Sequence, residues 1–361
     1  MIRVESGSRL HFGLLSFGQR RQDTAKRVPT EAQQEMPGAW EPNRAFGGIG
    51  LMVDQPRLRL ELAKASSDQV ACGADRQLEV RLQHLLARWR QSLQQRGASS
   101  DHPAPTTAPW EQAASSGVRL QLLEAPPAHC GFGSGTQLGL ALAAGLSHLF
   151  RLPAGDSTTW ATWIGRGRRS AVGTHGFAEG GLIVDRGKLS CETVAPLASR
   201  LSFPSSWRFV IACNLSDSGL SGTSEQAAFS RLPAVPESHS RQMFAELHEE
   251  LLPAVAAEDF DRFAKSLWRY GNLAGDCFAS AQGGSRFSPP AQPWVDFARK
   301  AGFTGVGQSS WGPAVFIATP DDRSAHELVI KMKRAAVNAN SRFWIAQARN
   351  TGAEVSSVQM H

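Results

Sequence analysis

The stretch PPAHCGFGSGTQLGLALAAGL, residues 126–146, places three glycines within five positions and then continues into small apolar residues. Glycines let backbone N–H groups approach an anion, and the first turn of a helix adds unpaired N–H groups and the positive end of its dipole. The segment therefore predicts a phosphate-binding loop before a helix, which we expect to begin at or near Thr136, a residue type favoured at helix N-termini. The residues expected to contact phosphate are Gly131, Gly133, Ser134, Gly135 and Thr136.

Three familiar glycine-rich motifs do not fit this segment. No lysine follows the glycines, which excludes a Walker loop, and the spacing does not match G-x-G-x-x-G. Position 132 is Phe, which excludes the G-x-S-x-G elbow of hydrolases. A structural alternative stays open, in which the glycines only permit close packing of the following helix.

Length and composition are those of a soluble globular protein. The 361 residues predict two domains, and 42% of them are hydrophobic. The five cysteines are widely spaced and form no C-x-x-C pair, which argues for reduced thiols and against a zinc ribbon. No apolar run reaches the length of a membrane span, and the first residues lack the layout of a secretory signal. We therefore expect a cytoplasmic protein that binds no membrane.

The formal net charge of +6 raises the question of an anionic partner. The arginines are scattered, and the single tyrosine leaves no basic-aromatic pattern of the kind that binds nucleic acid. Small anionic substrates, or simply a basic solvated surface, explain the charge better than nucleic acid does. Association into a homodimer stays open.

The pattern along the chain mixes strands and helices without regular alternation, which predicts an α+β protein of two lobes. A hairpin is expected around Asp185–Gly187, and the mostly helical region 224–273 is expected to break near 232–236 and at Pro253. Segments 19–43 and 98–117 are expected to be exposed loops. The other expected elements are strands at 2–18, 118–130, 207–215, 304–308, 314–319 and 342–348, two strand-like runs after a glycine-rich turn within 46–65, and helices at 77–97, 136–150, 291–302 and 324–338.

Five motifs, in chain order, resemble the β-ribofuranosylaminobenzene 5′-phosphate synthase family within the GHMP kinase superfamily. They are SRLHFGLL (8–15), RAFGGIGLMVD (44–54), GFGSGTQLGLALA (131–143), GRGRRSAVGTHGFAEGGLIVDRG (165–187) and GVGQSSWGP (305–313). The resemblance implies a GHMP-kinase-like fold with an N-terminal α+β domain at 1–200 and a ferredoxin-like lobe at 201–361. The active site is then expected between the lobes, where the glycine loop meets the QSSWGP turn.

This family is understood to condense 5-phosphoribosyl 1-pyrophosphate with p-aminobenzoate or a related benzoate, releasing carbon dioxide and pyrophosphate. The reaction is an early step toward methanopterin-type one-carbon carriers, and Mg²⁺ is expected to offset charge on the leaving group. Many superfamily kinases carry P-S-G-V-D, whose Asp is the base for the accepting hydroxyl. The chain reads RSAVG at 169–173, so Gly173 stands at that Asp position. The alternatives left open are an ATP-dependent small-molecule kinase and a non-catalytic ligand sensor.

Charged residues in the motifs are candidates for catalysis and anion binding. Arg9 and His11 lie two positions apart on an expected strand, so they share a face and could hold a phosphate or carboxylate. Arg169 and His175 flank a glycine-rich bend, where an arginine could grip pyrophosphate with its planar fork. Glu179 is a candidate magnesium ligand or general base. For Arg9 and His11 the alternative is an exposed strand face, and for Arg169 and His175 it is ordinary surface charge.

The remaining candidates concern the aromatic substrate. Trp311 could stack on its ring, although a packed core tryptophan beside a tight turn explains the residue equally well. Gln308, Ser309 and Ser310 could orient the ring from the same turn. Gly47 and Gly48 are expected to let the backbone pass close to the ligand or the adjacent sheet.

Overall fold

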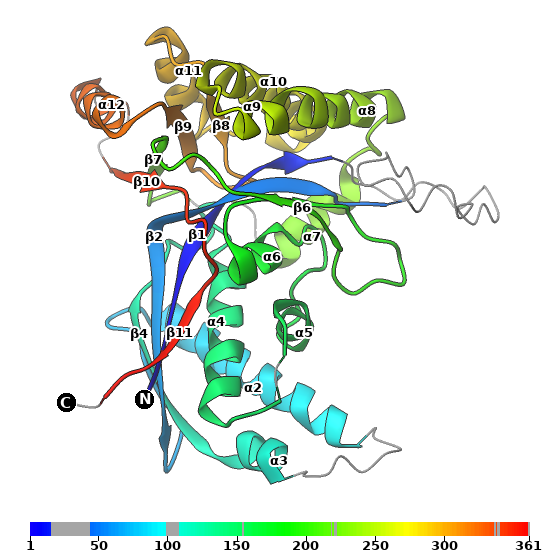
Figure 1. Cartoon of the computed structure of the whole chain (residues 1–361), viewed down its shortest axis with the longest axis vertical. Coiled ribbons are helices and arrows are strands. Elements are labelled where there is room, and N and C mark those ends of the chain that lie inside the picture. Colours follow the sequence, from blue (N-terminus) through cyan, green and yellow to red (C-terminus); the bar gives the residue numbers. More distant parts are fainter. Residues whose placement is uncertain are drawn as a thin grey trace, which may run out of the picture.

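The first and the last described strands lie in the same sheet, the first of two. The computed structural model describes residues 1–15, 44–98, 108–153, 155–217, 219, 222–335, 337 and 340–359. Strand β1 runs antiparallel to both β2 and β11, and the strand order is β11-β1-β2-β4-β3 (Figure 1). Strand β5 pairs with the beginning of β2, and β6 pairs with β5. The strands are β1 (Ile2–Leu14), β2 (Gly48–Ala65), β3 (Gln69–Ala71), β4 (Gly117–Glu124), β5 (Leu182–Asp185), β6 (Leu197–Leu201) and β11 (Glu354–Ser357).

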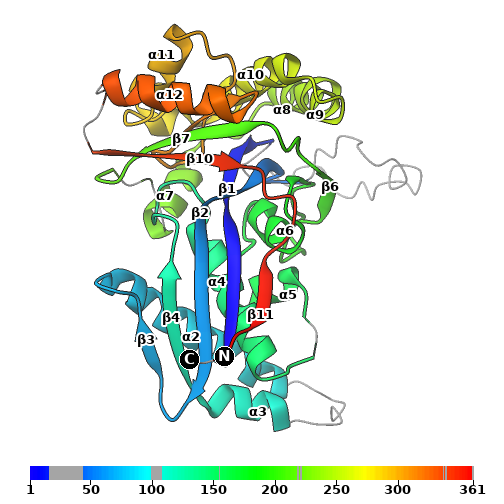
Figure 2. The same cartoon turned by 60° about the vertical axis from the view of Figure 1, so that its left-hand side comes forward.

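Helix α4, Ser134–Leu149, is the central helix behind this sheet (Figure 2). It packs against β1 and β2 on one side and against α2, α5 and α6 on the others, so nearly all of its residues are buried. Glycines make this packing close: a Cβ at Gly145 would lie 2.5 Å from Leu62, and one at Gly139 would lie 2.4 Å from Ile164. The other helices of this lobe are α2 (Arg76–Ala98), α3 (Ala108–Ser115), α5 (Ser157–Trp163) and α6 (Val172–Glu179).

The second sheet has the strand order β10-β7-β9-β8, with every neighbouring pair antiparallel. Along the chain its elements are a strand, helices, two strands, a helix and a strand, which is the ferredoxin-like arrangement that the family resemblance implies. Its strands are β7 (Arg208–Asn214), β8 (Val306–Gln308), β9 (Val315–Thr319) and β10 (Ser341–Gln347). Its helical segments are α7 (Gly222–Arg231), α8 (Glu237–Ala245), the π-helical η1 (Glu246–Leu251), α9 (Leu252–Ala256), α10 (Phe260–Phe278), η2 (Ala279–Gln282), α11 (Gln292–Lys300) and α12 (Asp322–Ala335).

One hydrophobic cluster joins the two sheets. It contains Leu10 and Phe12 of β1 together with Phe209 of β7 and Phe316 of β9. The ring centroids of Phe12 and Phe316 lie 5.2 Å apart. The half of β1 that contains Leu10 and Phe12, called here the far half, therefore belongs to the interface between the lobes. Its side chains lie where the lobes meet.

The structure corrects several local expectations. Helix α4 begins at Ser134, with Gly133 rather than Thr136 at its N-cap. The strand that returns to β5 is β6, not the segment directly after Gly187. Segment 98–117 contains α3, and Pro253 lies in the first turn of α9 without breaking the run of helices, because its missing N–H costs nothing there. Segment 19–43 lies outside the described residues.

None of the described helices combines the length and the hydropathy that crossing a membrane requires.

Candidate active site

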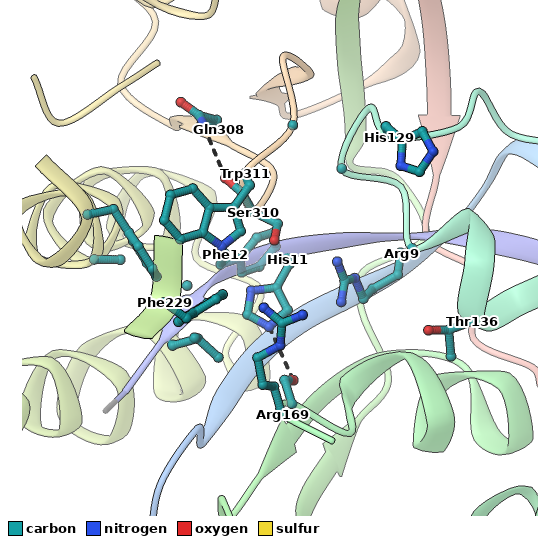
Figure 3. A pocket seen from close by; sticks show the side chains of 18 of the residues that line it. Arg9, His11, Phe12, His129, Thr136, Arg169, Phe229, Gln308, Ser310 and Trp311 are labelled. Atoms are coloured by element: carbon teal, nitrogen blue, oxygen red, sulfur yellow. Dashed lines mark hydrogen bonds between the residues drawn. The ribbon is translucent and has the colours of Figure 1, made fainter. Parts of the chain in front are cut away.

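A cavity of about 490 Å³ lies where the glycine loop, the far half of β1 and the turn after β8 meet. Both lobes contribute to its walls: α4 and β1 come from the first, and α10 and the 308–312 turn come from the second. Figure 3 shows His11 in the middle of the labelled side chains, with Trp311 and Phe229 to one side and Arg9 and Thr136 to the other.

The glycine loop forms one end of this cavity. Gly131 and Gly133 have φ of 95° and 67°, in the left-handed region that favours glycine. No side chain caps α4. The Thr136 N–H donates to the Gly133 carbonyl at 2.9 Å, so the first-turn N–H groups that could turn to a ligand are those of Ser134 and Gly135. All five residues predicted for phosphate contact line the cavity.

Arginines converge on the same end. A Cβ at Gly135 would lie 2.0 Å from an Nη of Arg81 and 2.9 Å from an Nη of Arg166, and one at Gly133 would lie 3.3 Å from Nε of Arg9. Burial lowers the pKa of Arg81 from its usual value, but a guanidinium stays charged at neutral pH. Three cations and a helix N-terminus therefore surround the loop, an arrangement that suits a phosphate or pyrophosphate.

The electrostatics of the whole cavity favour anions. Its lining includes no Asp or Glu among the residues that the structure describes. Within the same described residues, no group of three or more His, Cys, Asp or Glu side chains could hold a metal ion. The donor set of the described lining therefore does not fit a magnesium ion held by protein carboxylates, whereas its guanidinium groups suit an anion. The six arginines of the lining are Arg9, Arg81, Arg166, Arg168, Arg169 and Arg286.

The opposite side of the cavity is aromatic. The Trp311 ring packs edge-on against Phe229 and Phe278, with centroids 5.1 and 4.7 Å away. The Arg169 guanidinium lies 4.5 Å from the centre of the Phe229 ring. The indole of Trp311 is 91% buried, and its Nε1 has no hydrogen-bond partner among the described residues. This wall offers a planar apolar ring a place to pack and an N–H donor beside it.

The QSSWGP turn joins the two ends, as the sequence predicted. Ser309 Oγ donates to the Gly131 carbonyl at 2.7 Å and accepts from the His11 N–H at 3.0 Å. Ser309 thus clamps the glycine loop to β1 and does not itself line the cavity. Ser310 lines it with φ of 55°, and Gln308 lines it while its amide bonds Gln282, the Ser288 N–H and the Ser310 carbonyl.

A buried chain of hydrogen bonds leads from the cavity to a carboxylate. His11 Nε2 lies 3.2 Å from Ser170 Oγ, which donates to Asp185 Oδ2 at 2.7 Å. Burial raises the pKa of Asp185 to about 6, whereas the hydrogen bonds that it accepts favour the ionised form. Burial and the nearby Arg9 charge hold the pKa of His11 well below its usual value. His11 is therefore neutral at pH 7 and adds no positive charge to the site.

Other predicted residues lie elsewhere. His175 lies on α6, just after the glycine-rich bend. Its ring points away from the cavity, and Nε2 lies 2.9 Å from the Ala195 carbonyl. Glu179 is exposed at the end of the same helix. Gly47 and Gly48 do not line the cavity; a Cβ at Gly48 would lie 2.9 Å from both His11 Nε2 and Ser170 Oγ. Gly48 therefore leaves room for the His11–Ser170 contact.

Gly173 occupies the position discussed for the kinase base. It lies in the first turn of α6, and a Cβ there would be 3.4 Å from Thr136 and 3.7 Å from Arg9. A side chain at this position would thus reach the cavity, and glycine supplies none.

Sequence reasoning missed Ser170, Asp185, Arg81, Arg166, Phe229 and Phe278. Arg81 and Phe229 lie in segments whose own pattern indicates only an amphipathic helix, and tertiary packing brings them to the site. Ser170 and Asp185 fall within the motif 165–187, but nothing in their spacing shows that β5 and the bend lie side by side.

Comparisons with known proteins agree with this geometry. No protein-family model matches the chain. Over 325 residues it is 27% identical to β-ribofuranosylphenol 5′-phosphate synthase of Archaeoglobus fulgidus, covering 86% of this chain and 92% of that protein. The enzyme of the same name from Methanothermobacter thermautotrophicus is 27% identical over 330 residues, covering 87% and 92%.

Solved structures share the fold. Homoserine kinase from Cytophaga hutchinsonii superposes with a TM-score of 0.59 at 15% identity, covering 98% of this chain and 97% of that one. Mevalonate pyrophosphate decarboxylase from Streptococcus pyogenes gives 0.59 at 12% identity, covering 97% of both chains. The GHMP-kinase-like α+β fold is therefore confirmed, as is the expectation of an enzyme related to these synthases.

Proposed function

We propose that the chain transfers the ribofuranosyl 5-phosphate group of 5-phosphoribosyl 1-pyrophosphate to the carboxyl-bearing ring carbon of a para-substituted benzoate, releasing pyrophosphate and carbon dioxide. The observation that carries this proposal is one cavity with a glycine loop surrounded by arginines at one end and an aromatic wall at the other. Such a cavity suits two substrates, one bearing several phosphate charges and one a flat ring.

The acceptor that we favour is 4-hydroxybenzoate. The relatives are named for a ribofuranosylphenol product, and carbon–carbon bond formation at the carboxyl-bearing carbon of 4-hydroxybenzoate yields such a phenol. The amino analogue, p-aminobenzoate, has the same shape and is the second acceptor to test. Either product would be a precursor of a methanopterin-type carrier.

The residues divide the chemistry between them. Arg9, Arg81 and Arg166 with the first turn of α4 bind phosphate groups and stabilise the charge that gathers on departing pyrophosphate. Phe229, Phe278 and Trp311 hold the ring against the sugar, which converts an encounter of two substrates into a reaction within one complex. Carbon dioxide then leaves from the ring carbon that has formed the new bond, and aromaticity returns.

The kinase alternative lacks support at the site. Phosphoryl transfer to a hydroxyl needs a way to hold Mg²⁺, and the described lining residues supply no carboxylate for that purpose. The glycine loop and the arginines around it do not discriminate between the two reactions, because both would use a substrate that carries phosphates.

The test is release of labelled carbon dioxide from carboxyl-labelled 4-hydroxybenzoate and p-aminobenzoate, each with phosphoribosyl pyrophosphate and Mg²⁺. Omission of the sugar and a parallel assay of ATP consumption serve as controls. We expect sugar-dependent release that falls by about 100-fold in Arg9→Ala and not in Arg323→Ala, whose side chain is 88% exposed on α12. Consumption of ATP with an alcohol acceptor and no carbon dioxide would identify a kinase. Tight sugar binding with neither activity would identify a sensor.

A further inference from the structure

Every hydrogen-bonding position of Ser170 is occupied. Its Oγ donates to Asp185 Oδ2 at 2.7 Å and accepts from the Val172 N–H at 3.2 Å. A hydroxyl has one proton and two lone pairs, so one lone pair remains for His11 Nε2, 3.2 Å away. His11 must therefore donate through Nε2–H, and Nδ1 carries the lone pair.

Asp185 fixes which way the hydrogen bond between His11 and Ser170 runs. Three backbone N–H groups, those of Gly48, Ala171 and Gly187, also point at its carboxylate, at 2.8 to 3.2 Å. A carboxylate among four donors acts as an acceptor only, so the Ser170 proton stays directed toward it. Asp185 on the buried strand β5 thus sets the tautomer of His11 through Ser170.

The free nitrogen of His11 belongs to the cavity. His11 lines it, and no described residue forms a hydrogen bond with Nδ1. Among the described residues of the lining, the only other imidazole is that of His129, which is exposed beside the glycine loop; the remaining polar side chains are arginines, hydroxyls, amides and an indole. Arginine does not accept a proton and hydroxyls are poor bases at neutral pH, so His11 is the buried base of this part of the cavity.

We propose that His11 Nδ1 is the general base that takes the proton of the acceptor's phenolic hydroxyl, and that Ser170 and Asp185 are its positioning residues. This inference rests on the proposed function. Removing that proton turns the hydroxyl into an oxyanion, which pushes electrons toward the para carbon, the one that bears the carboxylate.

The step balances without a further reactant. The ring carbon forms a bond to the anomeric carbon as the bond from that carbon to pyrophosphate breaks, and the electron pair leaves with pyrophosphate. The bond to the carboxylate then breaks, carbon dioxide leaves, and its electron pair restores the aromatic ring. The resulting phenolate recovers the proton from His11, so no proton is gained or lost overall.

An amino acceptor does not need this base. The nitrogen of p-aminobenzoate donates its lone pair to the ring without losing a proton. The two acceptors have the same size and shape, so they use the cavity alike in every respect except the need for a base. Comparing them therefore isolates the role of the base.

The experiment compares both acceptors in wild type and in His11→Asn, with His326→Asn on the surface of α12 as matched control. We expect the variant to lose about 10²- to 10⁴-fold in kcat with 4-hydroxybenzoate and less than about tenfold with p-aminobenzoate. A more acidic phenol, 3-fluoro-4-hydroxybenzoate, should recover part of the lost rate in the variant and change the wild type little.

The positioning residues have their own readouts. In ¹⁵N NMR spectra of the free protein, His11 Nδ1 should resonate as an unprotonated ring nitrogen and Nε2 as a protonated one. Ser170→Ala and Asp185→Asn should weaken that tautomer and lower the ratio of phenol to aniline turnover in the same direction as His11→Asn. A purely structural role for these residues would reduce both acceptors alike.

The possible results distinguish failure of this inference from failure of the proposed function. Equal losses with both acceptors in His11→Asn, or a protonated Nδ1, would overturn this inference while the synthase activity stands. A wild type that releases carbon dioxide from neither acceptor would overturn the proposed function, and this inference with it.

Discussion

At the scale of single residues, Trp311 combines two roles that its sequence context left as alternatives. Its ring packs on Phe229 and Phe278 like a core residue, and it lines the cavity with a buried Nε1–H that no described group accepts. A buried donor without a partner costs free energy, and a ligand oxygen would remove that cost. We infer that this N–H meets an oxygen of the aromatic acceptor.

Trp311→Phe tests that donor, because it keeps an aromatic ring and removes the N–H. A hydrogen bond to a charged group contributes about 1.5 to 3 kcal/mol, so we expect the KM for the benzoate to rise roughly 10- to 100-fold. The KM for the sugar substrate should stay within about twofold. Steady-state kinetics with each substrate varied in turn measures both, and Trp110→Phe on α3 is the control. An unchanged benzoate KM would leave Trp311 as a packing residue only.

Asp185 makes stability depend on pH. Its pKa is raised from 3.8 to about 6 in the folded chain, so the folded state binds this proton more tightly than the unfolded state does. The contribution of Asp185 to stability therefore falls as pH rises from about 4 to 6 and is constant above that, by roughly 2 to 3 kcal/mol in all. Urea unfolding of wild type and Asp185→Asn at both ends of this window measures the difference. A gap between the two proteins that does not change with pH would contradict the assignment.

Residues of this kind explain what the sequence could and could not predict. The five loop residues line the cavity together with Arg9 and His11. The sequence could group each set, because the loop residues are consecutive or nearly so and Arg9 and His11 lie two positions apart on one strand. Ser170 and Asp185 were not found, since their contact depends on which strand pairs with β2. His175 was predicted from a motif that does approach the site, but helix geometry directs its side chain elsewhere.

At the scale of elements, α4 is both the core helix of the first lobe and the wall of the cavity. Its apolar length buries it between the sheet and three helices, and this fixes where its first turn points. Arg81 comes to the same point from α2, an element that shares no sequence motif with the loop. The anion binding that we propose therefore depends on how two helices pack as well as on the glycines.

Arg81→Ala tests this cooperation between α2 and α4. Loss of one half-buried guanidinium beside a phosphate should raise the KM for phosphoribosyl pyrophosphate by roughly 10- to 100-fold, because charge-assisted hydrogen bonds contribute about 1.5 to 3 kcal/mol each. Benzoate affinity should be unaffected. Arg76→Ala, exposed at the start of α2, is the matched control. If both variants bind the sugar equally well, Arg81 is a structural cation and the loop acts without it.

Long elements with a clear period were predicted well, whereas short or distant ones were not. Helix α2 and strand β7 are confirmed nearly to the residue, because each carries a continuous apolar pattern. Helices α5 and α6 and strand β11 were missed: α5 and α6 have seven and eight residues, too few for a period to stand out. Strand β11 has four, and its pairing with β1 joins residues from opposite ends of the chain.

At the scale of the whole molecule, the cavity exists only because the two sheets share a core. Phe209 of β7 is fully buried, with ring centroids 6.3 Å from Phe12 of β1 and 6.0 Å from Phe316 of β9. The same far half of β1 carries Arg9 and His11. The packing of these rings, which holds the lobes together, therefore also sets the distance between the glycine loop and the aromatic wall.

Phe209→Ala should consequently destabilise both lobes and not the second alone. Truncation of a buried Phe costs about 3 to 5 kcal/mol, and the shared cluster spreads that cost over the interface. Hydrogen exchange followed by mass spectrometry should show faster exchange through global opening in peptides from α4 and from β9 together, with Leu123→Ala, exposed on β4, as control. Faster exchange in β9 with α4 unchanged would mean that the lobes open independently. The cavity between them would then be an assembly of two separately stable parts, and its geometry could not be set by the common core.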